Sequence, residues 1–267
     1  MEKPGKQKSR PPARATKGEA RGAGPRLKSV AGGARASPII HEDVYERLRH
    51  AIIAGQLEPG RALSVRGLAA EFGVSAMPAR EAIRRLVALG ALELTQTRRV
   101  AVAHMTPEKF DELAIARCAL EPALAGLALR KTASDARARE GLVSKLKTID
   151  AALDEAIARG DIADYGRRNS EFHFALYEAA EAPVLLGLVE SLWLQIGPFM
   201  RIVIGRLGTS SLVDHHREAI AALAAGEEAK LEEAVRRDLM QGMSRIAREV
   251  SGDAPELTRA ERKRARR

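Results

Sequence analysis

Apolar residues recur every three to four positions along most of this chain, a period that predicts a mainly α-helical protein. The clearest signal lies between residues 64 and 94, where a glycine turn separates two short helical patterns. Ser64 is placed to cap the first helix and Gly73 to end it, and Ser75 is placed to cap the second. Pro78 falls in the first turn of that second helix, where a missing N–H is tolerated. This spacing is typical of a helix-turn-helix, so DNA binding is the leading hypothesis.

The second helix of this pair has one apolar and one polar face. Met77, Arg80 and Arg84 are expected to point outward, opposite a buried stripe made by Ala79, Ala82, Ile83, Leu86 and Leu89. Residues at the start of such a helix meet base edges, and an arginine there contacts guanine or holds a phosphate. The alternative is a surface αα-hairpin whose arginines are merely solvated.

The flanking patterns complete a winged domain over residues 39–104. An amphipathic helix precedes the pair and ends at Gly55. The residue pattern in 92–94 and in 100–102 has the alternation of a strand, which predicts two strands joined by the polar loop 95–99. Three helices and a two-stranded hairpin are the elements of a winged helix-turn-helix.

Three segments in order, VYERLRHAIIAGQLEPGRAL, LAAEFGVS and PAREAIRRLVALGAL, resemble the GntR family of bacterial transcription regulators. The resemblance implies that Arg66 and Arg80 contact DNA. The chain departs from the family pattern at Ala76, where a basic or polar residue is usual, and at Arg99, where a wing glycine is common. The first departure means that the family's usual operator half-site cannot be assumed for this chain. Together with the helical pattern, the resemblance gives a DNA-binding set of Arg66, Ser75, Met77, Pro78, Arg80, Arg84 and Arg99.

The composition agrees with two folded domains between basic tails. The chain has 267 residues and a net charge of +9, of which residues 1–37 carry +8 and residues 255–267 carry +4, so the middle carries about −3. The tails, 1–38 and 251–267, lack an apolar period and are expected to be disordered. They either attract phosphate non-specifically or only aid solubility. The single cysteine, Cys118, fits a reducing cytosol.

Residues 105–250 show helical periods and no strand pattern, which predicts an antiparallel bundle of six or seven helices. Thr106 is placed to cap its first helix and Pro107 to begin it. The segments ARCALE and SEFH, and His216 with Ala222, resemble the FadR-like group of GntR regulators. The resemblance implies that this bundle is the effector-binding domain known as FCD.

Four polar residues are expected on inward faces of the bundle: Asn169, His173, His216 and Asp238. In the resembled family one Asp or Asn and three histidines hold a metal ion, and these four residues stand at those positions. Asp238 replaces the usual histidine. Because His215 and His216 are neighbours, the sequence does not decide which of them takes the ligand position. Two imidazoles and a carboxylate suit zinc, manganese or nickel. The alternative is that all four are hydrogen-bonded core residues.

Inducers of the family are typically small organic acids, and a carboxylate needs a cationic partner. Arg117 lies on the inner face of the first bundle helix and is the main candidate to bind the effector. Its alternative role is an ion pair with Glu121, four residues on. Arg201 is the second candidate, with a surface position as its alternative.

Together these features predict a cytoplasmic, homodimeric repressor that binds a pseudopalindromic operator and responds to a small carboxylate. An enzyme is not expected, because no separate general base or nucleophile motif occurs. The rival hypothesis is a helical metalloenzyme that uses His173, His216 and Asp238. A third is an architectural DNA binder that depends on the tails. No apolar run of about 18 residues and no signal core are expected, so no membrane partner is predicted.

Overall fold

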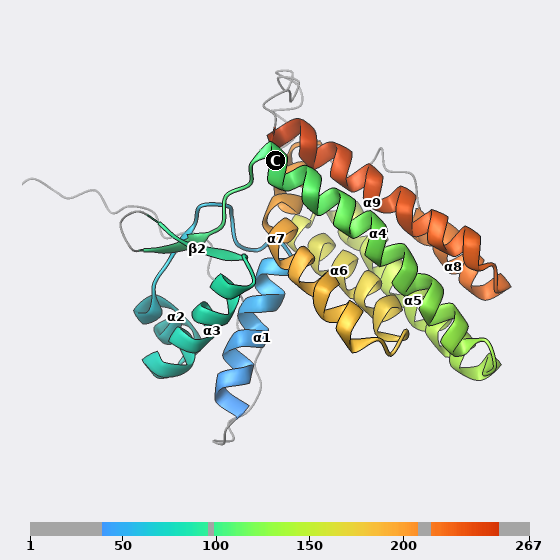
Figure 1. The fold of residues 1–267 in the computed structure, drawn as a ribbon, viewed down its shortest axis with the longest axis horizontal. Helices are drawn as coiled ribbons and strands as arrows, with labels where there is room; N and C mark the ends of the chain where they lie inside the picture. Colours follow the sequence, from blue (N-terminus) through green and yellow to red (C-terminus); the bar gives the residue numbers. More distant parts are fainter. Residues whose placement is uncertain (1–38, 96–98, 208–214, 251–267) are drawn as a thin grey trace, which may run out of the picture.

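The computed structural model of the chain describes residues 39–95, 99–207 and 215–250. Figure 1 shows a small domain beside a bundle of long helices. The predicted tails, 1–38 and 251–267, lie outside the described residues. The small domain contains α1 (Ile39–Ile53), β1 (Ala62–Leu63), α2 (Val65–Phe72), α3 (Ala76–Ala88), β2 (Leu92–Leu94) and β3 (Val100–Val102).

The helix-turn-helix of α2 and α3 follows from local capping. The Ser64 side chain accepts a hydrogen bond from the Gly67 N–H at 2.9 Å, which satisfies a free donor at the start of α2. Gly73 ends α2 with a φ of 66°, a left-handed conformation that glycine adopts without a side-chain clash. The predicted start and end of α2 are confirmed.

Ser75 stands at the N-cap position of α3, but its side chain makes no capping hydrogen bond. The other capping side chains, such as those of Ser64 and Thr106, accept from the N–H three residues on. Three residues after Ser75 stands Pro78, which has no N–H. The predicted N-cap position of Ser75 is therefore confirmed, but its side chain does not cap the helix, and Pro78 removes one of the two N–H groups that such a side chain uses.

The wing contains a three-stranded sheet in the order β1-β3-β2, rather than the expected two-stranded hairpin. Both neighbouring pairs are antiparallel, with Leu63 opposite Val100 and Leu92 opposite Val102. The additional strand β1 has only two residues, too few to show an alternating pattern in the sequence.

The larger domain consists, within the described residues, of six helices: α4 (Pro107–Thr132), α5 (Ala136–Arg159), α6 (Ile162–Glu178), α7 (Pro183–Leu207), α8 (His215–Ala225) and α9 (Glu228–Val250). The side chains of Thr106, Asp135 and Asp161 cap α4, α5 and α6. Helices α4 to α7 run in alternating directions, and α9 packs along α4 (Figure 1). The mainly helical fold with a winged domain and an antiparallel bundle is confirmed.

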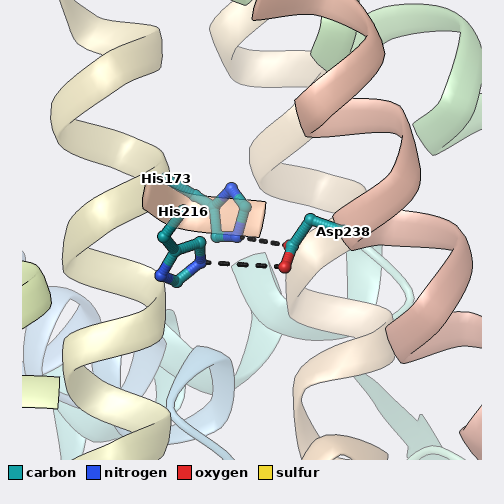
Figure 2. A group of neighbouring side chains, drawn as sticks. All are labelled: His173, His216 and Asp238. Atoms are coloured by element: carbon teal, nitrogen blue, oxygen red, sulfur yellow. Dashed lines mark ion pairs between the residues drawn. The ribbon is translucent and has the colours of Figure 1, made fainter. Parts of the chain in front are cut away.

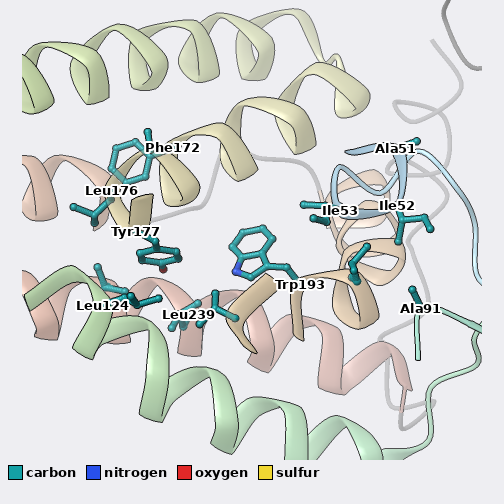
Figure 3. Packing of buried hydrophobic residues seen from close by; sticks show 14 of the residues in the cluster. Ala51, Ile52, Ile53, Ala91, Leu124, Phe172, Leu176, Tyr177, Trp193 and Leu239 are labelled. Atoms are coloured by element: carbon teal, nitrogen blue, oxygen red, sulfur yellow. The ribbon is translucent and has the colours of Figure 1, made fainter. Parts of the chain in front are cut away.

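One hydrophobic core extends from the winged domain into the bundle. A single cluster of buried residues includes Ile52 of α1, Leu124 of α4 and Phe172 of α6. Figure 3 shows Trp193 of α7 between Tyr177 in the bundle and the end of α1. Because apolar burial is the main favourable contribution to folding, the two domains stabilise each other through this shared core.

Helix α7 contains Pro183–Met200, a stretch that is long and apolar enough to cross a membrane by length and composition alone. The sequence expectation that no such run exists is wrong by this measure. Val189 and Trp193 of the stretch are buried in the protein core. Glu190 forms an ion pair with Arg49 of α1 at 2.6 Å. These contacts are those of a core helix that joins the two domains.

Two glycines allow α1 to touch the bundle with its backbone. A Cβ atom added to Gly166 of α6 would lie 2.5 Å from the Ala54 carbonyl oxygen. A Cβ atom added to Gly197 of α7 would lie 2.5 Å from the Ile52 carbonyl oxygen. Any side chain at either position would push the end of α1 away from the bundle.

We therefore expect Gly197→Ala to lower the free energy of unfolding by about 1–3 kcal/mol, because the added methyl group meets a carbonyl that cannot rotate away. Urea denaturation followed by circular dichroism measures this change.

Gly187→Ala in the same helix is the matched control, because nothing lies within 4 Å of the added Cβ there. This substitution should stabilise α7 by about 0.5–1 kcal/mol, since alanine favours a helix more than glycine does. Equal effects of the two substitutions would contradict the close approach of α1 and α7.

Candidate functional site

The exposed side of the helix-turn-helix carries most of the residues predicted to bind DNA. Arg66 is exposed at the start of α2, and Met77 and Arg80 are exposed in the first turns of α3. Within the part of the chain that the structure describes, Arg80 forms no ion pair. Arg80 can therefore reach a base edge or a phosphate without breaking an existing salt bridge.

Arg84 is exposed but already has a partner in its own helix. Its guanidinium donates to both carboxylate oxygens of Glu81, at 3.1 and 2.7 Å. A contact with DNA would require this exposed pair to open, which costs little at a solvated surface. Arg84 is therefore better placed for a phosphate contact than for reading a base.

Pro78 does not belong to the DNA-contacting surface, because the structure buries it together with Ala79 on the apolar side of α3. The sequence prediction that Pro78 contacts DNA is therefore wrong. Its position in the first helical turn explains its presence, since that turn tolerates a missing N–H. Ser75 remains exposed at the start of α3, where helix N–H groups favour a phosphate.

The wing brings one further arginine to the surface. Arg99 is exposed, and the loop before it is closed by a 2.8 Å hydrogen bond from the Thr95 N–H to the Arg99 carbonyl oxygen. Residues 96–98 of this loop lie outside the described residues. A cation on a wing is suited to the negative potential of a minor groove.

The second candidate site is a pocket of about 290 Å³ inside the bundle. His173 of α6, His216 of α8 and Asp238 of α9 line it, and each offers one ligand atom within 4.8 Å of the other two. Both imidazoles are buried, and the Asp238 side chain is 24% exposed. The structure thus brings together three of the four predicted metal ligands from three helices.

Asp238 faces both histidines, each of which points one ring nitrogen toward its carboxylate (Figure 2). Its Oδ2 is 3.1 Å from His173 Nε2, and its Oδ1 is 3.8 Å from His216 Nε2. Burial alone would raise the pKa of Asp238, but the hydrogen bond from His173 and the charge of His216 lower the pKa well below its ordinary value. The carboxylate is therefore held in its charged form, the form that binds cations.

These residues fit a divalent transition metal. Ligand bonds of about 2.0–2.2 Å at a tetrahedral ion place neighbouring donor atoms about 3.3 Å apart, and the two separations at Asp238 lie on either side of that value. Two imidazole nitrogens and one carboxylate oxygen are typical ligands of zinc, and of nickel or manganese with additional oxygen donors.

Asn169 and His215 also line the pocket. Asn169 is buried one turn before His173 on α6, where its amide oxygen is suited to be an additional weak ligand. His215 forms a 3.0 Å contact with Glu218, whereas its neighbour His216 belongs to the three-residue cluster. Of the two neighbouring histidines, His216 is therefore the one that lies with His173 and Asp238.

Arg117, the main effector candidate, lines the same pocket but is already engaged. Its Nε lies 2.5 Å from Glu121 Oε1, and its guanidinium carbon lies 4.6 Å from the centre of the Trp193 ring. Burial alone would lower the pKa of Arg117, but the Glu121 carboxylate raises it above its ordinary value. The geometry favours the ion pair over effector binding. Arg201 belongs to α7, and its side chain lies outside the described residues.

A group of buried polar residues behind the cluster was missed or not used in the sequence analysis. Glu121 is fully buried and accepts hydrogen bonds from Tyr177 and Trp193. Asp150 of α5 is buried and lies 3.2 Å from His216 Nδ1. Asp150 stands four residues after Leu146 on an apolar stripe, a signal that identifies an inward-facing acid.

Comparison with known proteins identifies both domains. The profile of the gntR family of bacterial regulatory proteins matches residues 40–102, and the FCD domain profile matches residues 112–241. The HTH-type transcriptional regulator McbR of Escherichia coli K12 is 29% identical over 183 residues, which are 68% of this chain and 80% of McbR. The HTH-type transcriptional repressor GlaR of the same strain is 26% identical over 223 residues, 79% of this chain and 97% of GlaR.

Solved structures show the same fold. The E. coli McbR structure has a TM-score of 0.71 at 24% identity, covering 79% of this chain and 98% of that one. A GntR transcriptional regulator from Rhodococcus sp. RHA1 has a TM-score of 0.60 at 24% identity, covering 77% of this chain and 96% of its own.

The metalloenzyme hypothesis is not supported, because the relatives are transcriptional regulators. The matched profiles follow the order of the two domains along the chain, and their ranges contain the helix-turn-helix and the pocket. The chain belongs to the GntR family of bacterial transcription regulators, with an FCD domain as its helical bundle.

Proposed function

We propose that this protein is a ligand-responsive repressor that binds an operator through its winged domain and is released by a small organic acid bound in the bundle. The observation that carries this proposal is the convergence of His173, His216 and Asp238 in a pocket whose helices α6 and α7 also contact α1. The relative GlaR is named a transcriptional repressor, which supports repression rather than activation. The order of the two domains supports the FadR-like group.

The DNA contacts are assigned from exposure and chemistry. Arg80 and Met77 read base edges from the start of α3, and Arg66 and Ser75 hold phosphates beside them. Arg99 enters the minor groove from the wing. A two-fold dimer of this chain would present two such domains to a pseudopalindromic operator in the cytoplasm.

The pocket binds a divalent transition metal, zinc, manganese or nickel, through His173, His216 and Asp238, with Asn169 as a further ligand. The metal supplies the positive charge that an acidic effector needs. Without a metal the pocket disfavours an anion, because Asp150, Asp154 and Asp238 line it while Arg117 is paired with Glu121. An ion held by these residues would supply the charge that attracts the effector carboxylate, and the apolar wall of the pocket would cover the rest of the acid.

The route from the pocket to the DNA is short. Helix α6 carries His173 and also Gly166, which touches the backbone of Ala54 at the end of α1. Helix α7 carries Trp193 and Gly197 one turn later, and Gly197 touches Ile52. A shift of α6 or α7 on effector binding therefore moves the winged domain directly.

We expect Arg80→Ala to weaken binding to an operator selected from a random DNA pool by about 1–3 kcal/mol, because an exposed arginine that reads a base is lost. Fluorescence anisotropy with labelled operator measures the loss, and circular dichroism should show an unchanged fold.

Arg137→Ala is the matched control, since Arg137 is an exposed arginine of α5 in the bundle. It removes the same charge and should leave operator affinity within error of the original protein. An Arg80→Ala protein with unaltered affinity and specificity would remove Arg80 from the DNA-contacting set.

Protein purified without chelator should carry about one transition metal ion per chain by elemental analysis. Trp193 is the only tryptophan in the chain, and its ring centre lies 5.2 Å from that of His173. Nickel added to the metal-free protein should therefore quench tryptophan fluorescence, because an open-shell ion close to an indole deactivates its excited state. A chelator should restore the signal.

The double substitution His173→Ala with His216→Ala should abolish both metal uptake and quenching while operator binding remains. Exposed His50 and His104 provide the matched control pair, and their substitution by alanine should leave metal uptake unchanged. If the original protein takes up no metal and shows no quenching, the four pocket residues are only hydrogen-bonded core groups.

A further inference from the structure

Glu121 is a buried carboxylate that the proposed function does not use directly. Its Oε2 accepts hydrogen bonds from the Tyr177 hydroxyl at 2.8 Å and from Trp193 Nε1 at 3.0 Å. Arg117 donates from Nε to Glu121 Oε1 at 2.5 Å and from Nη2 to Oε2 at 3.3 Å. A fully buried charge is stable only when it is paired and hydrogen-bonded in this way.

The hydrogen bonds around Tyr177 fix the direction of the next one. A tyrosine hydroxyl has one proton, and here that proton points to the Glu121 carboxylate, which can only accept. The Tyr177 oxygen, 3.1 Å from His173 Nδ1, must then accept a hydrogen bond from that nitrogen.

His173 therefore carries a proton on Nδ1, and its Nε2 faces the Asp238 carboxylate at 3.1 Å, to which it donates a hydrogen bond in the metal-free protein. His216 shows the same arrangement with a different partner. Its Nδ1 lies 3.2 Å from the Asp150 carboxylate, and its Nε2 faces Asp238. Two separate acceptors thus orient the two imidazoles toward one point, and a cation binding there displaces any proton on Nε2 to the solvent.

We propose that Tyr177, held by Glu121, and Asp150 are positioning residues that fix the Nδ1-protonated form of His173 and His216 and present both Nε2 atoms to a divalent transition metal. This inference rests on the proposed metal site and assigns its supporting shell. Partners of this kind orient ligating imidazoles, and their loss typically weakens metal binding about 10- to 100-fold.

The first test is Tyr177→Phe, which removes the acceptor and keeps the aromatic ring. The dissociation constant for zinc, measured by competition with a chromogenic chelator, should rise about 10- to 100-fold. Tyr45→Phe is the matched control, because Tyr45 is a buried tyrosine of α1 in the winged domain, and zinc affinity should not change.

The second test is Asp150→Asn, which removes the charged acceptor of the His216 Nδ1–H. Zinc affinity should fall by about 10-fold or more. Glu155→Gln is the matched control on the same helix. Glu155 is exposed on α5 away from the pocket, pairs with Arg159 at 3.6 Å, and should leave zinc affinity within about 2-fold when neutralised.

A spectroscopic measurement separates positioning from general stability. Nitrogen-15 NMR of protein labelled at histidine reports which ring nitrogen carries the proton. In the metal-free protein His173 should carry a proton on Nδ1 and should lose it in Tyr177→Phe, where Nε2 alone donates to Asp238; a loss of stability by itself would not change this signal. Tautomers and zinc affinities that stay the same in both Tyr177→Phe and Asp150→Asn would overturn the inference.

Failure of the proposed function gives a different result. In that case the original protein binds no zinc, whereas the Nδ1 proton of His173 is still observed and is still lost in Tyr177→Phe. A His173 without an Nδ1 proton in the original protein would overturn the positioning assignment regardless of metal uptake.

Discussion

The arrangement of the whole molecule depends on direct backbone contact between α1 and the bundle. Gly166 and Gly197 leave room for the carbonyl groups of Ala54, directly after α1, and of Ile52 in its last turn. The Ile52 carbonyl also accepts a hydrogen bond from the Gly55 N–H at 3.0 Å, so the turn that ends α1 holds it in place. The contact holds α1 against the two helices, α6 and α7, that carry His173 and Trp193, and the shared apolar core forms around it.

The same helices place a polar network inside an apolar bundle. An unpaired Glu121 would destabilise the fold strongly, because a buried carboxylate loses its hydration. Arg117, Tyr177 and Trp193 compensate for that loss, and the network then extends through His173 to Asp238. Apolar residues of similar size would serve stability equally well. Retaining this network is therefore best explained by the orientation it gives to the pocket.

The sequence predicted those features that depend on neighbouring residues. Ser64, Gly73 and Thr106 act over three or four positions, so the helix ends they set are where the sequence placed them. The separation of four residues between Asn169 and His173 likewise fixes a common helix face. The helical class and the order of the two domains follow from such local patterns.

The remaining features depend on contacts that are distant in the sequence. Strand β1 exists because it pairs with β3, and Gly197 is required because α1 packs on α7. Pro78 lies at an expected helix start, but which side of α3 is buried depends on α1 and α2. The alternatives for Arg117 remained open in the sequence, since the helical spacing to Glu121 allows the pair but does not exclude a ligand. The burial of both residues favours the pair.

The central claim is that the pocket around His173, His216 and Asp238 is mechanically connected to the winged domain through α1. Hydrogen–deuterium exchange of the protein with and without zinc tests this claim most directly. The account predicts slower exchange in α6 and α8 on zinc binding and, in addition, slower exchange in the last turns of α1, because α6 and α7 become more rigid against it. Slower exchange in α6 and α8 with unchanged exchange throughout α1 would contradict the claim.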